Sequence, residues 1–83
     1  MAVRKTGRDK GFGDARYRVL VEKLIDARIS QRTTQLALAA RLGRHQQFIS
    51  RYEQGERRLD AIEFVDVARA LSLDPATLIA AVP

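Results

Sequence analysis

Residues 34–54 read TQLALAARLGRHQQFISRYEQ, and this stretch decides the fold. Apolar residues at helical spacing on both sides of Gly43 predict two short helices, over residues 35–42 and 46–53. Gly43 can take the left-handed backbone conformation that so tight a turn needs. The helices must then cross steeply, and Ala39 supplies the small residue at the crossing. We expect the pair to be held to the core by Leu38, Leu42, Ile49 and Tyr52.

The second helix of this pair has two chemically different faces. At ~100° per residue, Phe48, Ile49 and Tyr52 fall on one apolar arc. The opposite face carries only polar and basic side chains, which are Gln46, Gln47, Ser50, Arg51 and Gln54. Glutamine can pair with adenine, arginine with guanine, and serine with several base edges. The alternative is that this face is simply solvated, but its lack of acids favours base contacts, which we assign to Gln46, Gln47, Ser50 and Arg51.

The chain before this pair divides at Asp14. Residues 1–13 hold three glycines and four basic side chains, which predicts a flexible basic arm. From Asp14, a good helix N-cap, apolar residues recur at helical spacing and predict a helix over about residues 15–29. Its apolar positions are Tyr17, Leu20, Val21, Leu24 and Ile25.

Two more helices are predicted after the pair. Asp60 begins the fourth helix, with Glu63 three residues later as its capping-box partner. Its apolar positions are Ile62, Phe64, Val65, Ala68 and Leu71. Asp74 followed by Pro75 is a strong start signal for a fifth helix. We therefore expect an all-α domain of five helices over residues 14–83, with no strand.

Composition excludes several classes of protein. A chain of 83 residues has room for one small domain. It has no cysteine and one histidine, His45, so we expect no disulfide, no metal centre and no cofactor. The longest apolar runs are five residues, against ~20 for a membrane span, and no signal peptide is visible. These features predict a soluble protein that fits a reducing cytoplasm.

Charge is unevenly distributed along the chain. Through Arg58 there are 14 basic and six acidic side chains, a net charge of +8. From Leu59 onward there are one basic and four acidic side chains, a net charge of −3. Positive potential therefore belongs to the first two-thirds of the molecule, which we expect to face a polyanion.

With these features in view, the sequence resembles a known family. TQ followed by LAARLG and then QQFISRYEQG resembles the helix-turn-helix of the Cro and phage-repressor type, in the XRE group of transcriptional regulators. ALSLDPATL resembles the ALGVSxxxL junction between the family's fourth and fifth helices, and Asp60 stands where the family usually caps the fourth. The resemblance spans about residues 15–80. It implies a lambda-repressor-like five-helix bundle whose third helix enters the DNA major groove.

The resemblance also implies roles for residues beside the third helix. Gln35 matches a position that contacts backbone phosphate, and a helix N-terminus there offers free N–H groups. Arg28 and Glu53 match positions that often form an ion pair. The remaining candidates for phosphate contact are Arg32, Arg44, His45, Gln54, Arg57 and Arg58.

Three residues depart from the family pattern. His45 replaces the usual Ser or Thr cap of the third helix, and Arg44 lies where an apolar residue is common. The register of the helix could therefore shift by one residue. Phe48 replaces a small polar residue, and it is expected to pack on the flank of the helix rather than to contact a thymine methyl group.

We expect a sequence-specific double-stranded DNA-binding regulator that acts as a repressor. The resemblance to the family implies that it binds a palindromic operator as a homodimer, with the fifth helix and the C-terminal residues as the contact surface. In the arm, Arg4, Lys5, Arg8 and Lys10 are candidates for minor-groove or phosphate contacts.

Rival classes fit less well. An enzyme would need convergent chemistry that is not visible, and an RNA-binding module would need exposed aromatic residues. The serious alternative is an antitoxin or other interaction module whose apolar segment 78–82 binds a protein partner such as a toxin, with DNA binding secondary.

Overall fold

The computed structural model describes residues 13–83, and within them it contains five α-helices and no strand. The helices are α1 (Ala15–Ser30), α2 (Gln35–Leu42), α3 (Gln46–Gln54), α4 (Ala61–Ala70) and α5 (Pro75–Ala80). The predicted all-α fold is confirmed, and α3 begins at the predicted residue without a shift of register. The predictions for Arg4, Lys5, Arg8 and Lys10 lie outside the described residues.

The helix starts follow the predicted capping chemistry. The side chains of four N-cap residues accept hydrogen bonds from backbone N–H groups two or three residues later: Asp14, Thr34, Asp60 and Asp74. The predicted capping box of α4 is complete, because Glu63 also accepts from the backbone N–H of Asp60. His45 makes no such bond at the start of α3. A helix therefore begins there without side-chain capping, which typically forgoes ~1 kcal/mol.

Among the described residues, four take a left-handed backbone conformation, each at a turn. Gly43 ends α2 at φ 65°, as predicted, and Gly55 ends α3 at φ 82°. The other two are not glycines: Arg32 has φ 55° and Ser72 has φ 60°. Ser72 occupies the glycine position of the ALGVSxxxL pattern, so the backbone keeps the geometry of a glycine turn with a residue that adopts it at a cost.

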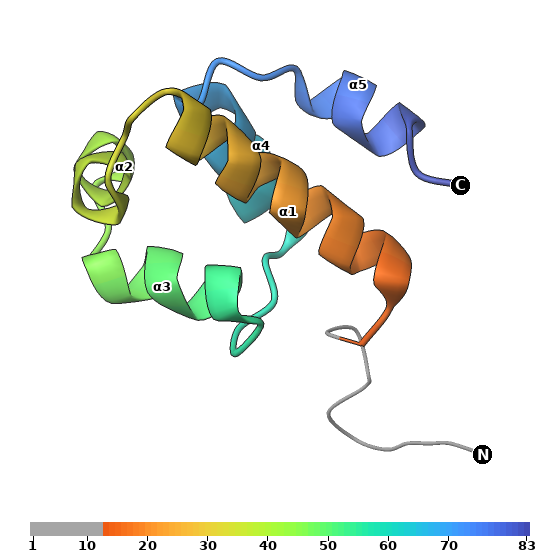
Figure 1. The fold of residues 1–83 in the computed structure, drawn as a ribbon, viewed down its shortest axis with the longest axis horizontal. Helices are drawn as coiled ribbons and strands as arrows, with labels where there is room; N and C mark the ends of the chain where they lie inside the picture. The colour runs from red at the N-terminus through yellow and green to blue at the C-terminus, as the bar shows by residue number, and fades with distance from the viewer. Residues whose placement is uncertain (1–12) are drawn as a thin grey trace.

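The steep crossing of α2 and α3 lies beside α1 and α4 (Figure 1). Ala39, at that crossing, is fully buried, as the short turn requires. The other side chains with 1% exposure or less are Val21, Leu24, Leu38, Ile49, Tyr52, Val67, Ala68 and Leu71. Leu42 packs against this core and is partly buried. In the helix pair, Ala39, Ile49 and Tyr52 are thus fully buried, and Gly43 takes the left-handed conformation between the two helices.

The apolar face of α4 differs from the prediction. Ile62 is 70% exposed, whereas Val67, which was not among the predicted apolar positions, is fully buried. The reason is the phase of the helix: the buried stripe is Phe64, Val67, Ala68 and Leu71, spaced i, i+3, i+4 and i+7. Ile62 falls outside that stripe and faces solvent.

Candidate nucleic-acid interface

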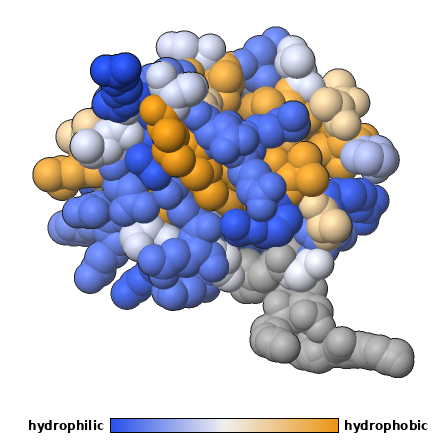
Figure 2. Space-filling model, viewed as in Figure 1, coloured by the Kyte–Doolittle hydropathy of each residue, from blue (hydrophilic) through white to orange (hydrophobic). Residues whose placement is uncertain are grey.

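The predicted polar face of α3 points away from the core. Gln46, Gln47, Arg51 and Gln54 are exposed and Ser50 is half-buried, with its Oγ accepting a hydrogen bond from Gln54 Nε2 at 3.2 Å. Ile49 and Tyr52 are fully buried on the opposite side. Figure 2 shows the hydrophilic surface that results over α3, at lower left in the view of Figure 1. No acidic side chain interrupts the outward face.

A buried carboxylate lies along one flank of α3. Glu53 is 9% exposed and accepts from Arg28 Nε at 2.7 Å and from Arg28 Nη2 at 3.0 Å. The implied ion pair is therefore present, and hydrogen bonding to Glu53 raises the pKa of Arg28 further above its ordinary value. Gln35 Nε2 also donates to Glu53, at 2.9 Å, and Gln46 Nε2 donates to Gln35 Oε1 at 3.3 Å. A chain of hydrogen bonds thus links α1 to the first residue of α3.

A second carboxylate lies on the other flank. Glu63 of α4 accepts from both Nη1 and Nη2 of Arg57 at 2.8 Å and from Arg44 Nη2 at 3.3 Å. These bonds, with that from the backbone N–H of Asp60, lower the pKa of Glu63 to about 2. The sequence predicted Glu63 only as a capping residue. Arg57 is six residues and Arg44 is 19 residues from Glu63, and neither separation is a local ion-pair spacing that would have predicted the contact.

Phe48 lies between the two arginines of this flank. Its ring is 8% exposed and packs edge-on against Tyr52, with 5.6 Å between ring centroids. The guanidinium carbon of Arg44 lies 3.9 Å from the Phe48 centroid, and that of Arg57 lies 4.9 Å from it. The expected packing on the flank of the helix is confirmed. Arg44 stands where the family commonly has an apolar residue, and it packs on the Phe48 ring and donates to the Glu63 carboxylate instead.

A cationic hollow of about 230 Å³ opens beside these groups. It is lined by Arg44, His45, Gln47, Phe48, Arg51 and Arg57. It therefore joins the polar face of α3 to the flanking arginines, and its lining suits a phosphate group.

The remaining phosphate candidates lie elsewhere. Arg32 is exposed in the turn between α1 and α2. Arg58 is exposed as well, but its guanidinium lies over the Tyr17 ring, 4.7 Å from the centroid. Arg58 therefore faces α1 rather than the hollow beside α3.

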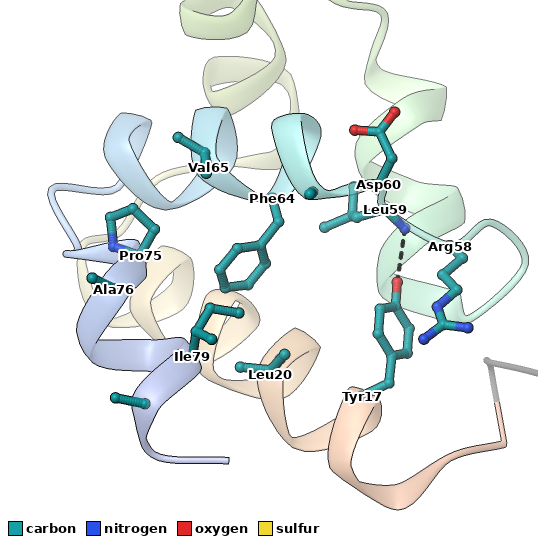
Figure 3. Close-up of a pocket in the computed structure, with 12 residues that line it drawn as sticks. Tyr17, Leu20, Arg58, Leu59, Asp60, Phe64, Val65, Pro75, Ala76 and Ile79 are labelled. Atoms are coloured by element: carbon teal, nitrogen blue, oxygen red, sulfur yellow. Dashed lines mark hydrogen bonds between the residues drawn. The ribbon is translucent and has the colours of Figure 1, made fainter.

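An apolar groove of about 610 Å³ lies between α1, α4 and α5 (Figure 3). Leu20, Phe64 and Ile79 converge in it, and Tyr17 closes one end, where its hydroxyl accepts from the backbone N–H of Leu59 at 2.9 Å. Ile79 is 52% exposed. In Figure 2 the hydrophobic surface near α5 and α1 lies to the right, away from the hydrophilic surface over α3.

Residues 13–83 hold neither a group of candidate metal ligands nor a candidate membrane span. No three His, Asp or Glu side chains in this range are grouped so that they could hold a metal ion. None of the five helices is long and apolar enough to cross a membrane.

Comparisons with known proteins agree with this geometry. A family model described as helix-turn-helix matches residues 24–78. A solved structure, an XRE-family like protein from Pseudomonas syringae pv. tomato str. DC3000, is 45% identical, with a TM-score of 0.78; the match covers 90% of this chain and 92% of that one. No curated protein matches.

The fold and the outward polar helix thus define a DNA-binding helix-turn-helix regulator. The chain belongs to the XRE-type helix-turn-helix family, which is typically non-enzymatic.

Proposed function

We propose that this regulator binds a specific double-stranded DNA operator and represses transcription by occupying it. The observation that carries the proposal is the outward face of α3, which is free of acids and rich in amides. With α3 in the major groove, Gln46, Gln47, Ser50 and Arg51 contact base edges. Gln46 enters the groove already fixed by its bond to Gln35, so its amide has fewer orientations to lose on binding.

Phosphate contacts hold the protein in register on both sides of this helix. Gln35 lies at the N-terminus of α2, where backbone N–H groups attract an anion. On the opposite flank, Arg44 and Arg57 present a cationic hollow to the second strand. The other proposed contacts come from Arg32, His45, Gln54 and Arg58, together with Arg4, Lys5, Arg8 and Lys10 of the arm. Each adds to affinity and salt dependence rather than to sequence choice.

We further propose a homodimer that uses the apolar groove, α5 and the C-terminal residues. An exposed Ile79 beside a groove of this size is surface that a second copy can cover. The groove lies away from the polar face of α3. Dimerisation through the groove therefore leaves α3 of each copy accessible to DNA. Two half-sites about 10 base pairs apart, centre to centre, form the palindromic operator.

Selection of binding sites from random duplex DNA tests this function. Wild type should select a palindromic sequence, and Gln47→Ala should lose preference at particular base pairs by about 1 to 3 kcal/mol each. Gln31→Ala is the matched control, because Gln31 donates to the Leu71 carbonyl at 2.7 Å and has no place on the polar face of α3. An unchanged sequence preference in Gln47→Ala would remove Gln47 from the base contacts.

The same groove supports a second candidate, an interaction module of a toxin–antitoxin pair. Ile79→Asp separates the two candidates, because a charge in the groove should abolish a homodimer and weaken operator binding. Sedimentation of wild type and variant gives the oligomeric state. A monomeric wild type, together with a toxin gene in the neighbouring reading frame, would favour the interaction module.

A further inference from the structure

Glu63 is connected to the hollow beside α3 without facing it. Its side chain is 12% exposed, whereas those of Arg44 and Arg57 are 41% and 39% exposed. The carboxylate therefore lies behind the two guanidinium groups. It also comes from α4, whereas Arg44 precedes α3 and Arg57 follows it.

The geometry restricts both guanidinium groups. Arg57 places two of its five N–H donors on Glu63, and its guanidinium lies 4.9 Å from the Phe48 centroid. Arg44 gives one donor to Glu63 and lies closer to the same ring. Each arginine keeps further donors for an anion that approaches from solvent. The Glu63 carboxylate lies behind the two guanidinium groups and the Phe48 ring lies beside them. Together they fix the direction in which the remaining N–H donors point.

We infer that Glu63 is a positioning residue for DNA binding, which holds Arg44 and Arg57 as a preformed clamp for backbone phosphate at the edge of α3. This inference rests on the proposed function, because it assigns a cause to the orientation of two proposed phosphate contacts. It has an unusual consequence for an acidic residue: its removal weakens binding to a polyanion, although the net positive charge of the protein rises.

Two variants test the inference. Glu63→Gln removes the charge but keeps an oxygen that can accept from the backbone N–H of Asp60. Glu63→Asp keeps the charge but shortens the side chain, so one carboxylate no longer reaches the cap and both arginines. Glu56→Gln is the matched control, because Glu56 is exposed in the segment between α3 and α4, next to Arg57, and its side chain makes no ion pair with the described residues.

The measurement is affinity for the selected duplex, of about 25 base pairs, over a range of salt concentrations. Both Glu63 variants should bind about 3- to 10-fold more weakly, and the slope of log K against log salt should flatten by about one. Glu56→Gln should bind as tightly as wild type or more tightly. Circular dichroism at the assay temperature confirms that each variant is folded.

The outcomes are distinguishable. If both Glu63 variants bind like wild type, or if Glu63→Gln binds more tightly as Glu56→Gln does, Glu63 is a helix cap and the inference is overturned, while the proposed function stands. If wild type itself selects no duplex, both fall. In a background of Arg44→Ala and Arg57→Ala, Glu63→Gln should have no further effect, because no clamp remains to be positioned.

Discussion

The two flanks of α3 each hold a glutamate that accepts from two side chains, yet the two groups serve different ends. The side chains of Glu53 and its partner Arg28 are only 8% and 14% exposed, so the hydrogen bonds between them are shielded from solvent. Glu63 is almost as sheltered, but its partners Arg44 and Arg57 extend into solvent. The comparison teaches that the role of a carboxylate follows from its partners: Glu53 stabilises the fold, and Glu63 arranges the surface.

We call the side of α3 with Arg28, Gln35 and Glu53 the inner flank, and the side with Arg44, Arg57 and Glu63 the outer flank. The largest effect should come from breaking the ion pair of the inner flank. Arg28→Ala leaves the Glu53 carboxylate sheltered with Gln35 as its remaining side-chain partner, and this should cost about 2 to 3 kcal/mol of unfolding free energy. Urea denaturation measures the loss. The matched control is Arg16→Ala, which breaks an exposed pair with Asp14 on the same helix and should change stability little. If the two variants were equally stable, the buried Arg28–Glu53 pair would contribute no more to stability than an exposed pair.

Acid should weaken the outer flank in a defined range of pH. The pKa of Glu63 lies at about 2 in the folded protein and at 4.5 ordinarily, so the folded state prefers the charged form. The resulting stabilisation is complete above pH 4.5 and is lost as the pH falls towards 2. Wild type should therefore melt a few degrees above Glu63→Gln at neutral pH, and the two melting curves should converge in acid. A difference that did not depend on pH would show that the charge of Glu63 contributes nothing to the fold.

A substitution outside both flanks sharpens the comparison by changing stability alone. Ser72 has φ 60°, so Ser72→Gly should relieve backbone strain and raise the unfolding free energy by about 0.5 to 1 kcal/mol. Thermal melting measures the gain. Affinity for the selected duplex should stay constant, and a change in affinity would mean that binding follows global stability rather than the arrangement of the outer flank.

The smallest effect is expected next to Glu53. The Tyr52 hydroxyl is buried and has no hydrogen-bond partner among the described residues. Burial and the nearby charge of Glu53 raise its pKa, so it stays protonated. Tyr52→Phe should therefore change the unfolding free energy by less than about 0.5 kcal/mol in a urea titration. A loss above about 1 kcal/mol would reveal a hydrogen bond that extends the inner flank.

The sequence predicted the fold and the polar face of α3 well, because both depend on local signals. Caps at Asp14, Asp60 and Asp74 and the glycine at position 43 define helix limits within a residue or so. The assignment of Ile62 to the apolar face of α4 was wrong, because the sequence allows more than one phase for that face and the structure buries Val67 instead.

The two carboxylate clusters were harder to predict. The Arg28–Glu53 pair was expected only from resemblance to the family, since charged residues are usually exposed. The reach of Glu63 to Arg44 depends on how α4 packs beside α2, which no local spacing encodes. The contacts proposed for DNA remain predictions.

The bond from the Leu59 backbone N–H to the Tyr17 hydroxyl has a consequence for both clusters. It ties the segment that carries Arg57 and Arg58 to the first turn of α1, while Arg28, near the other end of α1, is joined to Glu53. One straight helix therefore serves as a common frame for the two margins of α3. Because both attachments are to α1, the length of that helix between Tyr17 and Arg28 sets the distance between the two margins, and so the width of the surface offered to a ligand.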